Sequence, residues 1–354
     1  MEILLEEFYK QDLHDPHFVE RKIQLSEANA QIIGISQSGK SSLIKHYLLQ
    51  QKKASYLYID CNDIRIDINA LNTHLQAFCI EHSIDILALD NYDATIALPN
   101  IQQTLISGEQ AFSVKDFLLI RVYPLDFEEF LAYEHKFDST ALNHYLQLGG
   151  FPAMHRIPSE DRTRTLQQTL QHALNDIEFT LIMLITRMAS QKVSAFTLYE
   201  RLKSQRRISK DMLYKNMGQL INKGYIHQVE KFAHSRATKK LYLCDIAIKN
   251  ALTTQKHFGR LFENLVFLEL LKHEHAVYYD ERIDFYLSEE NRVVLCMPFS
   301  NKEMLFKKIE GIEGFLVAHQ VHRVEVITMS SEGELHHPFV DVEMMPFGIW
   351  ALGE

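Results

Sequence analysis

Short apolar runs alternate with amphipathic stretches through the first 130 residues of the chain. The strand-like runs lie at 30–35, 55–59, 84–89, 104–107 and 118–123. Helical spacing begins at Lys40, directly after the first of them. Strands that alternate with helices are typical of a parallel sheet with helices on both faces. The pattern therefore predicts a three-layer α/β domain over residues 1–130.

The pattern changes after residue 130. Residues 131–190 show helical spacing, broken by GGFP at Gly149 to Pro152, and predict a helical lid. Residues 191–250 give a helix, a turn, a second helix capped by Ser209 and two strand-like runs. Helix, turn, helix and hairpin together form the outline of a winged helix.

The last hundred residues predict a further α/β domain over 251–354. It begins with one apolar helix, GRLFENLVFLELLKHE, and continues with strands. The strand-like runs lie at 276–279, 283–287, 293–296, 315–318 and 324–328.

Composition places the chain among folded proteins. Its 354 residues are 46% hydrophobic and 23% charged, with only 13 Gly and 8 Pro, which excludes disordered and fibrous classes. No apolar stretch approaches the roughly 18–20 residues that span a bilayer, and the acidic N-terminus lacks the features of a signal peptide. The four cysteines have no C-x-x-C spacing. We therefore expect a cytoplasmic protein without a membrane partner, a disulfide framework or a cysteine zinc site.

The net charge of −9 conceals a basic segment. Residues 187–240 contain 13 Lys and Arg against three Asp and Glu, which leaves a charge of −19 on the remainder. A basic module attracts polyanions, so duplex DNA or RNA is an expected partner. The alternatives are a solvated helical face, or a face that docks onto the acidic remainder of this chain or of a second copy. The predicted nucleic-acid contacts are Arg206, Arg207, Lys210, Lys215, Lys239 and Lys240.

One motif carries specific chemistry. Residues 34–41 read GISQSGKS, the pattern G-x-x-x-x-G-K-[ST], between a strand and a helix. Backbone N–H groups of such a loop bind the α- and β-phosphates of ATP. Lys40 is then expected to reach the β- and γ-phosphates and Ser41 to ligate Mg²⁺. The predicted cofactor contacts are Gly34, Ser36, Gln37, Ser38, Gly39, Lys40, Ser41 and Ser42.

Hydrolysis needs groups beyond the phosphate loop. Asp90 ends the run ILALD and is predicted to be the second residue on Mg²⁺, as in a Walker B motif. Asn91 follows it and orients water without accepting its proton, so slow turnover is expected unless Asp93 substitutes. Ser107, at the next strand end, is a candidate γ-phosphate sensor. Strand-end turn residues are the alternative for Asp90 and Ser107.

The order of the motifs resembles a known family. Along almost the entire chain it is GISQSGKS, ILALDN, RVYPLDFEEFL, YLQLGGFP, KKLYLCDIAI, GRLFENLVFLELL and IDFYL. This succession resembles the prokaryotic AAA-like ATPases of the archaeal-ATPase type, which are related to the STAND signalling NTPases. The resemblance implies a P-loop domain, a winged helix and a PD-(D/E)XK nuclease-like domain of unknown function. It also implies that Pro152 packs against the nucleotide base, whereas the residues alone indicate a helix-breaking turn.

The C-terminal domain departs from that nuclease pattern. Glu263 and Asp284 match its first two acidic positions, although an ion pair and a turn residue are the alternative interpretation. The third strand, Val293 to Met297, contains neither the acid nor the lysine that metal-dependent cleavage requires. We therefore expect a degenerate restriction-endonuclease-like α/β domain without nuclease activity, in which the two acids hold Mg²⁺ weakly.

Three functions are compatible with these observations. The first is an ATP-binding, slowly hydrolysing AAA/STAND-like switch, in which nucleotide moves the lid and the winged helix. The second is a DNA-binding regulator with structural ATP, and the third is an ATP-dependent nuclease. ATP and Mg²⁺ are the expected cofactors, and a homo-oligomer is compatible with each function.

Overall fold

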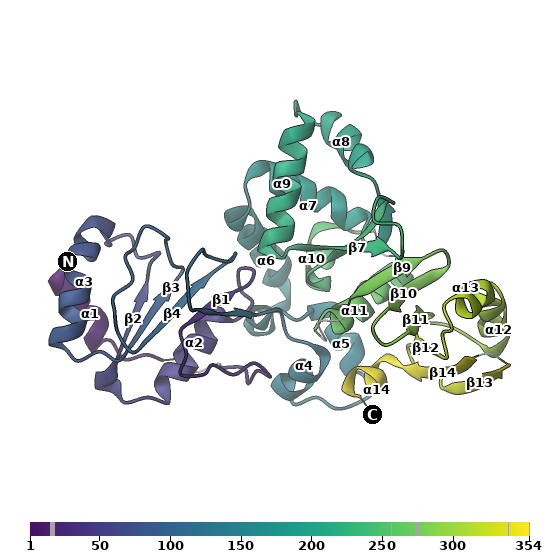
Figure 1. Cartoon of the computed structure of the whole chain (residues 1–354), viewed down its shortest axis with the longest axis horizontal. Helices are drawn as coiled ribbons and strands as arrows, with labels where there is room; N and C mark the ends of the chain where they lie inside the picture. The colour runs from purple at the N-terminus through teal and green to yellow at the C-terminus, as the bar shows by residue number, and fades with distance from the viewer. Residues whose placement is uncertain (15–17, 256, 273–275, 339, 354) are drawn as a thin grey trace. The chain divides into compact units, whose positions relative to one another are not determined.

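The chain folds into two compact units (Figure 1). The computed structural model describes residues 1–14, 18–255, 257–272, 276–338 and 340–353. The first unit comprises Met1–Leu125 and Phe151–Ala153, and the second comprises Asp126–Gly150 and the chain from Met154 onward. The first unit therefore contains the chain up to Leu125 together with the tripeptide Phe151–Ala153. The segments expected as lid, winged helix and third domain lie in the second unit, except for Phe151–Ala153 within the expected lid.

The first unit is built on a parallel sheet. Within the described residues this sheet has five strands in the order β2-β3-β4-β1-β5, and every pairing is parallel. The strands are β1 Ala30–Ile33, β2 Tyr56–Asp60, β3 Ile86–Asp90, β4 Gln103–Gly108 and β5 Leu118–Arg121. Their positions confirm the five strand-like runs. A short 3-10 helix, η1 Lys53–Ser55, precedes β2.

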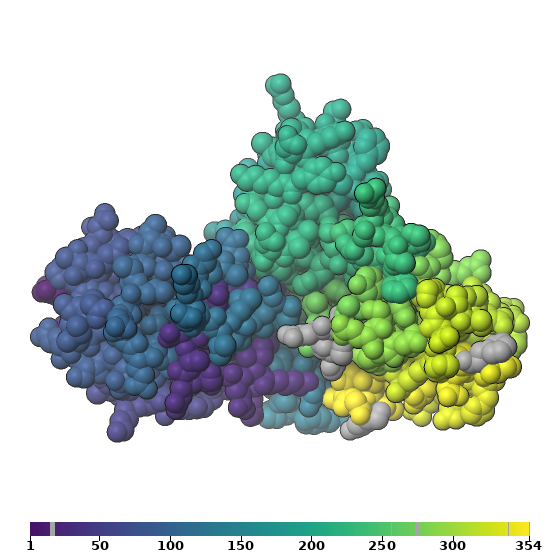
Figure 2. Space-filling model, in the orientation of Figure 1, coloured from purple at the N-terminus to yellow at the C-terminus, as the bar shows by residue number. Residues whose placement is uncertain are grey.

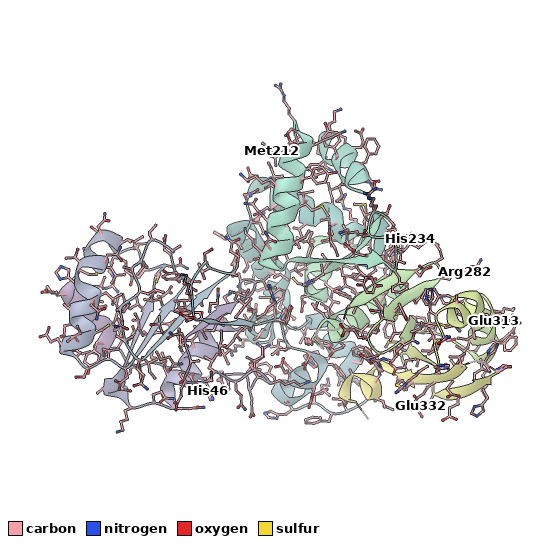
Figure 3. The ribbon with its side chains drawn as sticks, in the orientation of Figure 1. His46, Met212, His234, Arg282, Glu313 and Glu332 are labelled. Carbon is pink, nitrogen blue, oxygen red and sulfur yellow. The ribbon has the colours of Figure 1, made fainter. Side chains whose placement is uncertain are left out.

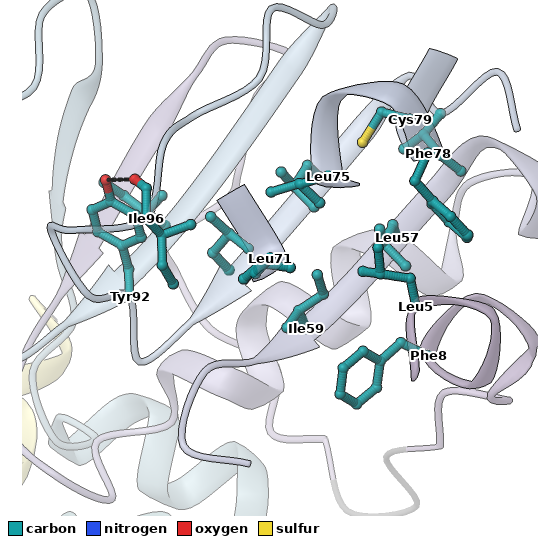
Figure 4. Packing of buried hydrophobic residues seen from close by; sticks show 14 residues of the cluster. Leu5, Phe8, Leu57, Ile59, Leu71, Leu75, Phe78, Cys79, Tyr92 and Ile96 are labelled. Carbon is teal, nitrogen blue, oxygen red and sulfur yellow. Dashed lines mark hydrogen bonds between the residues drawn. The ribbon is translucent and has the colours of Figure 1, made fainter. Parts of the chain in front are cut away.

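Helices cover both faces of this sheet. The helices are α1 Glu2–Lys10, α2 Lys40–Leu49 and α3 Ile68–Glu81. Leu71, Leu75 and Phe78 recur at helical spacing, so one face of α3 packs with α1 on the sheet (Figure 4). Leu43 and Leu48 of α2 pack into a separate core with β1 and β5 residues. The expected three-layer α/β arrangement is confirmed, although α1 was not predicted.

The second unit begins with helices. They are α4 Phe127–Glu134, α5 Ala141–Leu148, α6 Ser159–Ala173 and α7 Asp176–Arg187, with the 3-10 helix η2 Pro152–Arg156 after α5. Asp126 and Asn175 form capping boxes at the starts of α4 and α7, which explains where these helices begin. The helical character predicted for residues 131–190 is confirmed. No helix among the described residues has the length and apolar character needed to cross a membrane.

The expected helix, turn, helix and hairpin follow. The elements are β6 Gln191–Val193, α8 Ala195–Lys203, α9 Lys210–Lys223, β7 Ile226–Lys231, β8 Lys239–Leu243 and α10 Ile246–Leu252. The Ser209 hydroxyl accepts a hydrogen bond from the Met212 N–H, so Ser209 is the N-cap of α9 as predicted.

The last elements form one sheet with this hairpin. They are α11 Phe258–Leu271, β9 Val277–Asp280, β10 Ile283–Leu287, β11 Arg292–Cys296, α12 Lys302–Glu310, α13 Glu313–Ala318, β12 Arg323–Thr328, β13 Gly333–His337, β14 Val340–Pro346 and α14 Phe347–Leu352. Within the described residues the strand order is β13-β14-β12-β11-β10-β9-β7-β8-β6. Because β9 pairs with the open edge of β7, residues 191–250 and 251–354 share a nine-stranded sheet rather than forming two separate sheets.

One strand prediction was wrong. Residues 315–318 belong to helix α13, in which Leu316 is buried and Val317 is 54% exposed. This one-sided burial, with α12 preceding it, suits a helix that covers the sheet. Strands β13 and β14 and helix α12 were not predicted.

Candidate functional site

The GISQSGKS loop connects β1 to α2 and requires its glycines. Gly39 adopts a φ of +100°, which L side chains rarely adopt, and is the N-cap of α2. A methyl group on Gly34 would lie 2.2 Å from the carbonyl oxygen of Val122. The Gly34 N–H donates to the carbonyl of Gly108 at the end of β4 (3.1 Å). The loop is therefore held between the ends of β4 and β5.

Lys40 lies inside this loop. Its side chain is buried, and its ammonium donates to the carbonyls of Gly34 (2.8 Å) and Ile35 (2.9 Å). Burial lowers the pKa of the Lys40 ammonium, while the carboxylates of Glu109 and Asp90 act in the opposite direction. The Lys40 ammonium is thus enclosed by backbone carbonyl groups of the loop.

The serines of the loop differ in environment. Ser38 is fully buried, and within the described part of the chain its hydroxyl oxygen has no hydrogen-bond partner. Ser36 and Gln37 are half-buried, and Gln37 has a φ of 65°. Ser41 and Ser42 lie in the first turn of α2, where a helix N-terminus favours anions. The buried, unsatisfied Ser38 hydroxyl and the glycine-lined cradle fit a phosphate-binding loop.

Arg21 and Pro152 flank the loop. The buried Arg21 guanidinium donates to the carbonyls of Ser38 (2.9 Å) and Tyr123 (2.7 Å). A methyl group on Gly39 would lie 3.7 Å from Cγ of Pro152, so the proline that the family resemblance singled out lies beside the loop. Sequence reasoning missed Arg21, because it lies outside the motif and these two partners are 17 and 102 residues away in the sequence.

Asp90 and Ser107 come together at the ends of adjacent strands. Asp90 is 1% exposed; the Ser107 hydroxyl donates to its Oδ1 and the Tyr58 hydroxyl to its Oδ2 (2.7 Å). Burial, together with the Asp90 carboxylate, raises the pKa of Tyr58 well above its usual range, so the phenol stays a donor. Both carboxylate oxygens of Asp90 are therefore fixed in direction by hydroxyl donors.

Asn91 and Asp93 have other partners. The Asn91 amide side chain donates to Asp60 Oδ1 (3.0 Å), at the end of β2, and its backbone N–H donates to the Ser107 hydroxyl (2.9 Å). Asp93 accepts from the backbone N–H (2.8 Å) and hydroxyl (2.6 Å) of Thr95. These bonds lower the pKa of Asp93, which makes it a weaker base than the sequence suggested.

Glu109 is an acidic residue that sequence reasoning missed. It follows β4, whose last residue Gly108 pairs with Ile33 of β1 in the register. The Glu109 carboxylate also interacts electrostatically with the Lys40 ammonium, more strongly than Asp90 does. The available signal was its position directly after a strand-like run, the same signal that identified Asp90.

The predicted nucleic-acid contacts divide into two groups. Arg207, Lys210 and Lys215 are exposed around α9. Arg206 donates to the carbonyl of Asp176 (3.1 Å), and Lys239 pairs with Glu230 (2.6 Å). Three of the six residues therefore present their charge at the surface around α9. This segment is drawn in teal in Figure 2.

Lys240 lies in a different environment from the one expected. It is 8% exposed, and its ammonium is 2.8 Å from Glu263 Oε1 and 3.8 Å from Asp284 Oδ1. Burial alone would lower the pKa of Lys240, but the carboxylates of Glu263 and Asp284 raise it above its usual value. This placement does not fit the expected phosphate contact, because the Lys240 ammonium is buried and already pairs with two carboxylates.

Glu263 and Asp284 therefore share a protein cation. The Tyr242 hydroxyl also donates to Glu263 (2.7 Å), and the Cys296 N–H donates to Asp284 (2.9 Å). Among the described residues, no group of three or more His, Cys, Asp and Glu side chains is arranged to hold a metal ion. The ammonium of Lys240 occupies the position between the two acids where the sequence suggested weak Mg²⁺ binding.

Comparisons with known proteins add little functional information. No family model matches the chain. The chain is 25% identical over 386 residues to the uncharacterized protein MJ1544 of Methanocaldococcus jannaschii, covering 91% of this chain and 87% of that protein. The Orc1 protein of Aeropyrum pernix, solved in complex with DNA, has a TM-score of 0.30 and 13% identity, covering 71% of this chain and 91% of that chain. A score this low carries no inference for this chain.

The geometry itself defines the class of the first unit. A parallel sheet carries a glycine-rich loop after β1, a helix that begins at Lys40, and a buried acid at the end of β3. This arrangement fits a P-loop NTPase-like fold.

Proposed function

We propose that the protein binds ATP with Mg²⁺ at the 34–41 loop and hydrolyses it, as a nucleotide-dependent switch. The observation that supports this most is Lys40. Among the described residues its buried ammonium donates only to loop carbonyls, and the carboxylates of Glu109 and Asp90 act to raise its pKa. A triphosphate offers that ammonium a stronger, charged acceptor than a carbonyl.

Each residue has a defined task in this proposal. Loop N–H groups bind the phosphates, and Lys40 binds the β- and γ-phosphate oxygens. Ser41 and Asp90 would hold Mg²⁺, which neutralises charge that develops during phosphoryl transfer. Tyr58 and Ser107 orient Asp90 through their hydroxyl groups. Pro152, beside Gly39, is the proposed contact for the base.

Glu109 is the proposed base in place of Asn91. Its carboxylate accepts a proton from water as the water oxygen attacks the γ-phosphorus and the bond to the β-γ bridging oxygen breaks. Gly108 accepts a hydrogen bond from Gly34 at the start of the loop, and the carboxylate of the next residue, Glu109, acts to raise the pKa of Lys40. Asn91 is tied to Asp60 and Asp93 to Thr95, which leaves neither well suited to this step.

The experiment measures nucleotide binding and phosphate release separately. Lys40→Met is expected to lose both, while Lys52→Met, an exposed lysine of the same unit, keeps both. Glu109→Gln is expected to bind ATP normally and to release phosphate about 10²–10⁴-fold more slowly. Binding and turnover at the parent level in Lys40→Met would refute the ATPase proposal. Parent turnover in Glu109→Gln alone would refute only the role of Glu109.

A nucleic-acid-binding role is supported by the surface around α8 and α9, which we propose form a winged helix with the β7-β8 hairpin. Lys203 and Lys210 lie over the Tyr199 ring at 5.5 and 5.8 Å, and Phe196 and Tyr214 are 64% and 59% exposed. Met212, near the start of α9, is also exposed (Figure 3). Basic and aromatic side chains together suit a nucleic-acid backbone and its bases.

Salt dependence tests this role. Duplex DNA affinity should fall with salt, with a log-log slope of about −0.9 for each phosphate neutralised. Charge reversal at Lys210 and Lys215 should flatten the slope, whereas reversal of the exposed Lys302 on α12 should not. If no DNA or RNA binds at low salt, this role is refuted and docking onto an acidic surface is favoured.

The nuclease hypothesis has least support. Lys240 already pairs with both Glu263 and Asp284, and Leu295 is fully buried in β11. We propose that this part of the second unit is structural. Incubation with DNA and RNA in Mg²⁺ and Mn²⁺, with and without ATP, tests this, because cleavage that Glu263→Ala abolishes would contradict it.

A further inference from the structure

The second unit contains a pocket with a buried, unpaired lysine. The pocket lies between α5, α10 and the start of α11 and has a volume of about 550 Å³. Lys249 of α10 lines it and is 6% exposed. Within the part of the chain that the structure describes, its ammonium has no hydrogen-bond or ion-pair partner. Burial lowers the pKa of Lys249, and the positive charge of Arg260 acts in the same direction.

The remaining walls combine apolar and neutral polar groups. Leu146, Phe258 and Leu261 supply apolar surface, and Asn143 and Gln147 supply amide groups. The Asn250 amide ties α10 to α5 by donating to the carbonyls of Leu146 (2.9 Å) and Gln147 (3.2 Å), so the wall is a fixed part of the fold. Among the described residues that line the pocket there is no Asp or Glu.

Such a lysine is costly without a counter-ion. The Lys249 side chain is largely withdrawn from water, and a partly desolvated, unpaired charge is unfavourable. Both Lys249 and nearby Arg260 are cations, so the local potential is positive. A negatively charged group beside Lys249 would relieve this cost. The pocket volume falls within the range of small-molecule sites, and its apolar wall suits a hydrocarbon body.

We propose that this pocket binds a small organic anion, in which a carboxylate or phosphate pairs with Lys249 and an apolar body contacts Phe258 and Leu261. Asn143 and Gln147 supply further hydrogen bonds to the polar end. The site lies wholly within the second unit and is separate from the phosphate loop. It therefore does not depend on the ATPase proposal.

Benzoate and phenyl phosphate are suitable probes, with benzyl alcohol as the neutral comparison. Titrations by calorimetry use the full chain carrying Lys40→Met, which keeps phosphate groups out of the loop of the first unit. In this background we expect binding of at least one anion. Lys249→Met should weaken it by about tenfold or more, the loss expected for a charge-assisted hydrogen bond. Lys302→Met, at an exposed site on α12, should leave it unchanged.

A second measurement does not depend on the folding of a Lys249 variant. Lysine side chains of the same Lys40→Met chain are reductively methylated with ¹³C, and the Lys249 signal is followed during titration with each probe. Binding should shift that signal and raise the pKa of Lys249, because the anion stabilises its charge. Preference for benzoate or for phenyl phosphate identifies the anionic group. The proposal is refuted if neither anion moves this signal, or if Lys249→Met binds the anions as tightly as its parent.

Discussion

Replacing Lys240 tests whether Glu263 and Asp284 form a structural ion pair or the remnant of a metal site. The Lys240 ammonium is 2.8 Å from Glu263 and 3.8 Å from Asp284, and all three side chains are largely buried. Lys240→Met leaves two carboxylates without a cation inside the fold. Removal of one partner from a buried ion pair costs about 3–5 kcal/mol of the free energy of unfolding.

Two changes should restore part of the stability that Lys240→Met loses. Glu263→Gln removes one of the stranded charges, so the double variant Lys240→Met/Glu263→Gln should be more stable than Lys240→Met alone. In Lys240→Met, Mn²⁺ should restore part of the stability, because the two acids would accept a divalent ion in place of the ammonium. Since the pKa of Lys240 is raised, its contribution is complete at pH 7 and is lost only as the pH rises beyond the usual lysine range.

Urea unfolding at pH 7, with and without Mn²⁺, measures these effects. Lys192→Met is the matched control, because Lys192 lies on β6 and pairs with the exposed Glu281. Such exposed pairs contribute at most about 1 kcal/mol. If Lys240→Met is destabilised by no more than this control, and Mn²⁺ stabilises the parent, then the site holds a metal and our interpretation is wrong.

Two further predictions concern the Gly149–Asp245 contact. Asp245 is 1% exposed and accepts from the N–H groups of Gly150 and Ala247 (both 2.7 Å). Burial raises the pKa of its carboxyl from 3.8 to about 7, so the folded protein holds this proton more tightly than the unfolded chain. The resulting stabilisation is complete below pH 4, and the free energy of unfolding should fall by about 4 kcal/mol as the pH rises to 7. Unfolding midpoints between pH 4 and 8 should show this slope in the parent and not in Asp245→Asn; equal slopes would contradict the assignment. Gly149→Ala places a methyl group 2.1 Å from Asp245 Oδ1 at a φ of +71° and should cost more than about 3 kcal/mol, whereas Gly218→Ala, with nothing within 4 Å in α9, should stabilise the fold by about 0.5–1 kcal/mol. A similar effect of the two substitutions on urea unfolding would show that Gly149 is not constrained.

The features that the sequence could predict are local in origin. Strands β1 to β4 appear as continuous apolar runs because both faces of each strand are covered, whereas in the edge strand β5 Leu118 and Leu119 are about half exposed. The loop is marked by the glycines and Lys40 that its backbone requires. Ser209 was identifiable because capping depends on neighbours three positions away.

The features that the sequence could not predict depend on distant partners. Lys239 and Lys240 look alike in the sequence, yet they point to opposite faces of β8, and only Lys240 meets the rings of Tyr279 and Phe285 and the acid of α11. The pairing of β7 with β9 joins two expected domains into one sheet. It could not be predicted either, because the sequence does not show which edge of β7 is left unpaired by β8. Arg21 could not be predicted for the same reason, because its hydrogen-bond partners are distant in the sequence.

The assignment of Phe151–Ala153 to the first unit affects how the protein can be divided or recombined. The residues on both sides of this tripeptide belong to the second unit, so the polypeptide passes between the units at three peptide bonds, after Leu125, after Gly150 and after Ala153. A fragment that ends at Leu125 lacks Pro152, which lies beside Gly39. A chimera that exchanges the loop-bearing unit with that of a relative therefore has to replace two separate stretches of sequence. A single crossover near residue 125 would combine the first unit of one protein with residues 151–153 of the other.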